Sequence, residues 1–265
     1  MVARMDARRD IFPRGVFADF LLATAVLTRV PVGAAPPGTG SPGEAGVAAS
    51  SWAFPLVGAG VGGIAGSVLL AAQVLGCGDV VAALLAILAA LVVTGALHED
   101  GLADTIDGFG GGKDRDHKLA IMRDSRVGAY GVLALILGIG LRIGALAAIG
   151  GPVHAGLALI ATHAASRGFL PAAMRLMRPA RPDGLAAEAG RPSLTVTTVA
   201  LAGGLAIALG CLGPLSGLVM FAIGGAAATA MAALARHQIG GYTGDVLGAI
   251  QQVGEITMLL VAAAK

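Results

Sequence analysis

The chain alternates long apolar runs with short polar stretches, and this pattern predicts a bundle of membrane-spanning helices. Each of seven apolar stretches is close to the roughly 20 residues that a helix needs to cross a bilayer. The runs are continuous and rich in Ala and Leu instead of alternating, which favours helices over barrel strands. The expected fold class is therefore an all-α polytopic membrane helical bundle. The predicted spans are 51–75, 79–98, 129–149, 153–177, 193–212, 214–235 and 246–264.

The N-terminal region departs from this pattern. Residues 1–15 form a polar tail, and the apolar run Val16–Leu27 that follows is too short to span comfortably. We therefore expect an interfacial or re-entrant helix there. The whole chain, 1–265, is expected to be one integral-membrane catalytic domain, in which residues 99–128 form the active-site loop.

Lys and Arg are concentrated in the N-terminal tail and in the polar loops 99–128 and 178–192, whereas the turns at 76–78 and 150–152 carry none. Cytoplasmic loops of membrane proteins are enriched in Lys and Arg. If the first apolar helix does not span, both basic loops and the N-terminus lie on the cytoplasmic side. We therefore predict a cytoplasmic active site and an external C-terminus.

Composition agrees with a membrane protein. Hydrophobic residues make up 56% of the chain, charged residues only 13%, and the mean hydropathy is +0.82; soluble domains carry about 25% charged residues. The 42 glycines indicate helices that pack closely through small residues. A net charge of only +2 argues against a nucleic-acid partner.

The segment HEDGLADTIDGFGGG, residues 98–112, is the richest in chemistry. On a helix, Asp100, Asp104 and Asp107 fall within about 60° of one another, whereas Glu99 points about 100° away. Neighbouring like charges oppose helix formation unless something neutralises them, and Mg²⁺ prefers such oxygen ligands. The three aspartates are therefore predicted Mg²⁺ ligands. The alternative is a solvated acidic loop that caps a membrane helix.

Several cations could hold phosphate beside these acids. The segment KDRDHKLAIMRDSR, predicted to be helical from about 114 to 124, ends with Arg123 and Arg126 on either side of Asp124. We predict that both arginines bind phosphate, as guanidinium groups do well. Contacts to lipid headgroups or a topology signal are an equal alternative for the loop's other cations, Lys113, Arg115 and Lys118.

Charged residues also occur inside predicted spans. An arginine within the hydrocarbon region costs at least a few kcal/mol, so Arg167 should face the bundle interior, a cavity or a partner; we predict that it binds substrate, with snorkelling as the alternative. Arg142 lies nearer the outer side and is expected to be a structural pair or a snorkeller. Glu255 is expected to be buried.

Two further segments could bind an anion. GGYTGD, residues 240–245, opens the last helix, where Gly244 allows close approach and free N–H groups are available. Asp245 either belongs to that binding site or caps the helix. Arg29, just after the first helix, could reach phosphate or anchor the segment to headgroups.

An acidic metal site, arginines and a glycine-rich turn at one membrane surface indicate phosphoryl transfer from a pyrophosphate donor. The segments LTRVPV, EDGLADTIDGFGGG, IMRDSRVGAYG, SR and GGYTGDVLGA together resemble the cobalamin synthase (adenosylcobinamide-GDP ribazoletransferase) family, from about Leu27 to Gly248. The acidic motif is also similar to that of CDP-alcohol phosphotransferases. However, Phe109 and Gly110 stand where those enzymes have an Ala-Arg pair.

The resemblance implies a Mg²⁺-dependent enzyme of the bacterial inner membrane. Such an enzyme joins adenosylcobinamide-GDP to α-ribazole, or to its 5′-phosphate, and releases GMP. A CDP-alcohol-type phospholipid enzyme and an ion-coupled transporter are the alternatives. Membrane lipid is an expected partner, and a homo-oligomer or a complex with other corrinoid enzymes is allowed.

The same resemblance implies that the ribose 3′-hydroxyl of α-ribazole attacks the phosphorus attached to cobinamide. A hydroxyl is a weak nucleophile at neutral pH, so a carboxylate must take its proton or a metal must polarise it. We predict Asp107 as that base, because it lies furthest along the motif. Asp124 and Asp245 are the rivals, and Asp104 is expected to contribute as a catalytic ligand.

Overall fold

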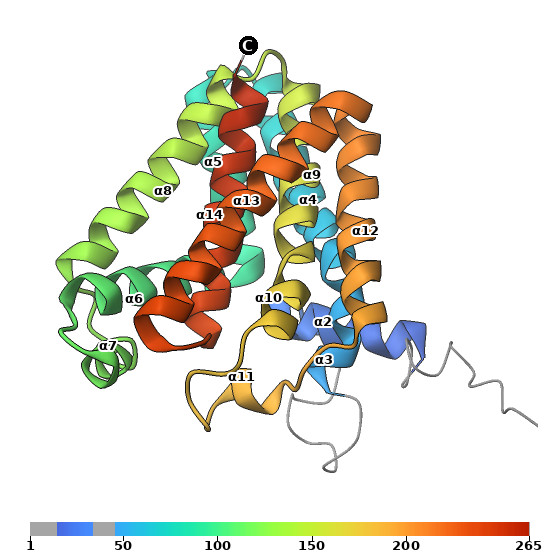
Figure 1. Cartoon of the computed structure of the whole chain (residues 1–265). Helices are drawn as coiled ribbons and strands as arrows, with labels where there is room; N and C mark the ends of the chain where they lie inside the picture. The colour runs from blue at the N-terminus through green and yellow to red at the C-terminus, as the bar shows by residue number, and fades with distance from the viewer. Residues whose placement is uncertain (1–14, 34–45, 265) are drawn as a thin grey trace, which may run out of the picture.

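A computed structural model describes residues 15–33 and 46–264, and this part of the chain is helical with no β-strand (Figure 1). The fold class predicted from the sequence is therefore confirmed, while most of the predicted polar tail lies outside the described residues. The elements are α2 (Val16–Leu27), α3 (Val47–Ser50), η1 (Ser51–Ala53), α4 (Phe54–Val74), α5 (Asp79–Thr94), α6 (Leu97–Gly111), α7 (Arg115–Ile121), α8 (Ala129–Ala148), α9 (Pro152–Gly168), α10 (Leu170–Leu176), α11 (Leu185–Glu188), α12 (Leu194–Leu212), α13 (Pro214–Ile239) and α14 (Gly244–Ala263).

Fewer helices than predicted are long and apolar enough to cross a membrane. In the described part of the chain there are five, or six if the bent pair α5–α6 counts as one span, so the count of seven is not confirmed. Two predicted spans end early: α5 stops at Thr94, and the stretch 153–177 divides into α9 and α10. The first apolar helix, α2, has 12 residues, in agreement with a helix that does not span.

The segment 99–128, predicted as an active-site loop between two spans, is mostly helical, and the helix expected from about 114 to 124 is present. Residues 97–111 form α6, and residues 115–121 form α7, whose N-terminus is capped by the Asp114 side chain. The chain breaks between α5 and α6 because Gly95 and Ala96 both adopt left-handed conformations, with φ of 64° and 56°. The two helices meet at 90°. The acidic motif therefore lies on a separate helix that turns away from the spans.

The polar elements gather at one end of the bundle. Figure 1 shows α3, α6, α7, α10 and α11 at the lower end and the C-terminus at the upper end. This arrangement agrees with the charge pattern, which placed both basic loops on one side and the C-terminus on the other.

Glycines bring α4 and α9 into backbone contact, as the glycine content predicted. A Cβ added at Gly58 would lie 2.2 Å from the carbonyl oxygen of His163, and one at Gly62 would lie 2.4 Å from that of Leu159. These positions are one helical turn apart, so they form a seam of small residues along α4. No larger residue fits there without separating the helices.

Replacement of Gly62 by alanine is expected to destabilise the bundle by about 1–3 kcal/mol, because the added methyl meets backbone that cannot move aside. The neighbouring Gly63 is a matched control, since an added Cβ there meets nothing within 4 Å. Gly63→Ala should be neutral or stabilising by up to about 1 kcal/mol. Thermal unfolding in detergent compares the two, and equal midpoints would contradict the seam.

Candidate active site

The acidic helix α6 packs against the start of α14, and glycines make the contact close. A Cβ added at Gly101 would lie 2.7 Å from the carbonyl oxygen of Asp245, and one at Gly248 would lie 3.1 Å from that of His98. Thr243 caps α14 by accepting a hydrogen bond from the Val246 N–H group. The interpretation of Asp245 as the cap is therefore wrong. The Asp245 carboxylate instead lies near enough to Asp104 of α6 to raise its pKa.

Asp100, Asp104 and Asp245 form one electrostatic group at this contact. α6 lies at the end of the bundle, at 90° to α5. Burial, together with the nearby charges of Asp100, Asp245 and Asp107, raises the pKa of Asp104 to about 7. Arg181, from the loop after α10, acts in the opposite direction. Like charges held this close favour a bound cation.

The acids alone do not form a complete metal cage. In the part of the chain that the structure describes, no group of three or more Asp, Glu, His or Cys side chains is placed to hold a metal ion. Mg²⁺, however, usually keeps several waters and takes only one or two carboxylates together with substrate phosphates. One or two acids of the group Asp100, Asp104 and Asp245 fit that kind of site, which a diphosphate would complete.

Asp107 is turned away from this group and toward α8. Its two carboxylate oxygens accept hydrogen bonds from the backbone N–H groups of Gly128, at 2.7 Å, and Gly131, at 2.8 Å. Both glycines are needed, since an added Cβ would lie within 2.5 Å of the carboxylate. Asp107 therefore anchors the beginning of α8, a use that the sequence pattern does not reveal.

Asp107→Asn is expected to lower the free energy of unfolding by about 1.5–3 kcal/mol, because an amide can accept only one of these two charge-assisted hydrogen bonds. Thermal unfolding and kcat at saturating Mg²⁺ should be measured together. Asp116→Asn is the control, since Asp116 is exposed and pairs only with its neighbour Arg115. Loss of kcat with unchanged stability would instead support Asp107 as the base.

The two arginines predicted to bind phosphate, Arg123 and Arg126, are paired with carboxylates in this structure. Arg123 bonds both oxygens of Asp183, at 2.7 and 2.6 Å, and Arg126 pairs with Asp124 at 2.6 Å. All four residues lie in loops outside the spans. Hydrogen bonds from Arg126 lower the pKa of Asp124 to about 2. A carboxylate with so low a pKa is a weak base, which argues against Asp124 as the proton acceptor.

The remaining predicted binding residues lie in three places. Gly244 is exposed at the first position of α14, beside Asp245. Arg29 packs against Gly95 at the α5–α6 break, and its backbone N–H donates to the Val93 carbonyl. Arg167 is buried in α9, where its guanidinium lies 2.9 Å from His163 Nδ1. The structure therefore does not bring Arg29 or Arg167 into the acidic group.

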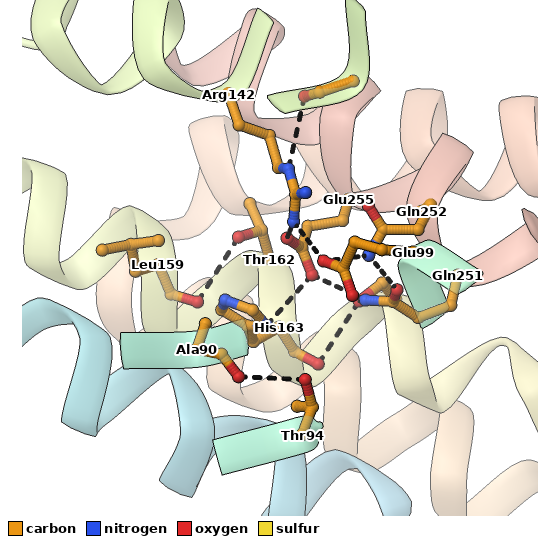
Figure 2. Close-up of polar contacts among 12 residues, drawn as sticks. Ala90, Thr94, Glu99, Arg142, Leu159, Thr162, His163, Gln251, Gln252 and Glu255 are labelled. Atoms are coloured by element: carbon orange, nitrogen blue, oxygen red, sulfur yellow. Dashed lines mark hydrogen bonds and ion pairs between the residues drawn. The ribbon is translucent and has the colours of Figure 1, made fainter. Parts of the chain in front are cut away.

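A buried ionic network lies behind the acidic face (Figure 2). Arg142 of α8 contacts Glu99 of α6 at 2.8 Å and Glu255 of α14 at 3.3 Å. Glu255 also lies 3.0 Å from His163 Nδ1 and 3.7 Å from Arg167. The prediction of a structural pair for Arg142 and of burial for Glu255 is confirmed.

Further amide contacts complete this network. Gln252 donates to Glu99 at 3.1 Å, and Gln251 donates to Glu255 at 2.6 Å (Figure 2). Glu99 points into the bundle because it lies about 100° around α6 from the aspartates. The network therefore connects the acidic helix with α8, α9 and α14.

Comparison with known proteins identifies the family of this chain. The family model described as cobalamin-5-phosphate synthase matches residues 19–263. The chain belongs to this family. Its activity is accordingly that of a cobalamin synthase, the transferase of the final step in assembling the cobalamin nucleotide loop, and its apolar helices fit a multi-pass membrane protein.

Curated relatives extend over most of the chain. It is 49% identical to an adenosylcobinamide-GDP ribazoletransferase of Bradyrhizobium diazoefficiens, with 95% of each chain covered. It is 46% identical to one of Mesorhizobium japonicum, with 94% of each covered, and 45% identical to one of Allorhizobium ampelinum, with 78% and 82% covered. No solved structure matches this member of the cobalamin-5-phosphate synthase family.

Proposed function

We propose that this synthase transfers the adenosylcobinamide phosphate of adenosylcobinamide-GDP to α-ribazole or its 5′-phosphate, with release of GMP, and that the reaction depends on Mg²⁺. The relatives that share up to 49% identity carry the corresponding name. The observation that carries the proposal within this chain is the convergence of Asp100 and Asp104 of α6 with Asp245 of α14.

In this proposal one or two of the acids Asp100, Asp104 and Asp245 hold Mg²⁺ together with the donor diphosphate. When bound, the ion supplies the positive charge that neutralises the diphosphate and the departing GMP. Arg181 lies beside Asp104 and Asp245 and donates a hydrogen bond to the Leu119 carbonyl, which orients it at the edge of the acidic group. Its remaining N–H groups are suited to a phosphate oxygen.

The acceptor's 3′-oxygen forms the new bond to the phosphorus attached to cobinamide, the bond from that phosphorus to GMP breaks, and the hydroxyl proton is released.

Asp107 holds the N-terminus of α8 and thereby the position of α6. Arg126 is exposed in the loop that Asp107 anchors through Gly128, and in this proposal it exchanges Asp124 for a donor phosphate. We place the site on the cytoplasmic face of the bacterial inner membrane, because the basic loops surround it.

Incubation of the purified full chain with adenosylcobinamide-GDP, α-ribazole and Mg²⁺ tests the proposal by the release of GMP. We expect turnover that stops with chelator and returns when Mg²⁺ is added in excess. Replacing the donor by a CDP-alcohol and measuring CMP separates the phospholipid-synthase alternative. GMP release that is insensitive to chelation would overturn the metal assignment, and no GMP release would overturn the reaction.

A further inference from the structure

A cavity of about 710 Å³ lies beside the proposed active site, between the loop that follows α10 and the turn that joins α13 to α14. Three arginines contribute to its wall: Arg178, Arg191 and Arg236. Met174 and Tyr242 add apolar surface. No Asp or Glu is among the described residues that line it. The cavity is therefore a basic pocket, and the proposed function so far gives it no role.

The described part of the chain supplies no carboxylate partner for the arginines of this pocket. The Arg178 Nε–H donates to the Gly240 carbonyl at 3.3 Å, and the Arg191 Nε–H donates to the Arg175 carbonyl at 2.8 Å. Among the described residues, none of the three pocket arginines forms an ion pair. Arg123, Arg126 and Arg142, by contrast, each have a carboxylate partner. Three like charges around one cavity favour an anion with more than one negative charge.

Backbone hydrogen bonds connect the two walls of the basic pocket. The Tyr242 N–H donates to the Arg178 carbonyl at 3.0 Å, and the Ala180 N–H donates to the Tyr242 carbonyl at 2.7 Å. Gly241 permits this contact, since an added Cβ would lie 2.2 Å from the Arg178 oxygen. The buried Tyr242 also donates its hydroxyl to the Ala186 carbonyl at 3.3 Å. The pocket is thus formed before any ligand binds.

The pocket adjoins the acidic group. Tyr242 in its wall precedes Asp245 by three residues, and three residues span at most about 11 Å. On the other wall, Arg181 follows Arg178 by three residues and interacts with both Asp104 and Asp245. A wall residue of the pocket and an acid of the group are therefore at most about 11 Å apart along the chain, a distance between their Cα atoms that a substrate can bridge.

We propose that the basic pocket binds the 5′-phosphate of the acceptor, α-ribazole 5′-phosphate. This inference rests on the proposed function. Both phosphates of the donor belong to the diphosphate that is broken, so they must lie at the acidic group with the metal. The acceptor's phosphate monoester is the only other phosphate in the reaction, and guanidinium groups without carboxylate partners match it.

The test compares two acceptors that differ only in this phosphate. KM should be measured for α-ribazole 5′-phosphate and for α-ribazole with the purified full chain, saturating donor and Mg²⁺. We expect Arg236→Gln and Arg191→Gln each to raise KM for the phosphorylated acceptor by about tenfold, and to leave KM for α-ribazole within about twofold. His237→Gln is the matched control, because His237 is exposed, follows Arg236 and does not line the pocket.

An equal rise in KM for both acceptors would overturn the proposal. A lipid headgroup offers the same phosphate chemistry, so the measurement is repeated in nanodiscs of phosphatidylcholine with and without phosphatidylglycerol. An effect of the arginine variants that occurs only with the anionic lipid, for both acceptors, would assign the pocket to lipid and overturn the acceptor assignment.

A binding measurement separates failure of this inference from failure of the proposed function. Thermal stabilisation by α-ribazole 5′-phosphate requires no turnover, and it should occur in the wild type and be lost in Arg236→Gln. If no GMP is released but this difference remains, the proposed reaction fails and the phosphate pocket stands. Equal stabilisation of wild type and variant overturns the pocket.

Discussion

Replacement of Asp104 by asparagine is expected to reduce kcat/KM by at least about 100-fold and to raise the Mg²⁺ concentration needed for half-maximal rate. Asp104 is the acid on which the charges of Asp100, Asp107 and Asp245 converge. Asparagine keeps the shape but removes the negative charge that attracts the cation. GMP release as a function of Mg²⁺ concentration measures both effects, and wild-type rates at limiting Mg²⁺ would contradict the assignment.

The raised pKa of Asp104 also predicts how the affinity for Mg²⁺ changes with pH. The pKa of Asp104 is raised to about 7 in the metal-free protein, so the proton competes with the cation below that pH. Apparent Mg²⁺ affinity should therefore increase from pH 6 to pH 8 and change little above it. In Asp104→Asn this dependence should be lost, whereas Asp116→Asn, at an exposed position, should retain it.

Replacement of Arg142 by leucine is expected to destabilise the protein by about 3–5 kcal/mol, because it leaves Glu99 and Glu255 partly uncompensated in the bundle interior. The exposed pair Arg123–Asp183 is the control, and its loss should cost no more than about 1 kcal/mol. Thermal unfolding in detergent at fixed protein concentration compares the two variants.

The double variant Glu99→Gln/Arg142→Leu separates charge balance from packing. It removes one charge of each sign and leaves Glu255 with His163 and Arg167. We therefore expect it to be more stable than Arg142→Leu alone, with a coupling energy of about 0.5–3 kcal/mol. Additive losses would mean that Arg142 contributes through its packing and not through its charge.

The helices, the acidic motif and the activity of this protein could be predicted from its sequence. Apolar runs predict the helices, because burial of a continuous apolar segment in lipid requires every backbone group to be satisfied within it. The 0, +4, +7 spacing placed Asp100, Asp104 and Asp107 on one helix, and the family resemblance pointed to the activity that the relatives carry. Arg142 could be expected to pair because an unpaired charge inside the bundle is too costly.

Only the tertiary structure decided which residues meet. Two consecutive left-handed residues, Gly95 and Ala96, turn α6 away from α5, and Ala96 is not a residue type that predicts such a conformation. Asp107 accepts hydrogen bonds from two backbone amides more than 20 residues away. The charges that act on Asp104 include that of Asp245 on the last helix. Helical periodicity is a local property, whereas the pairing of charges depends on how distant helices pack. The sequence therefore determined the helices and the acidic motif, and the packing of α6 between α8 and α14 decided how each acid is used.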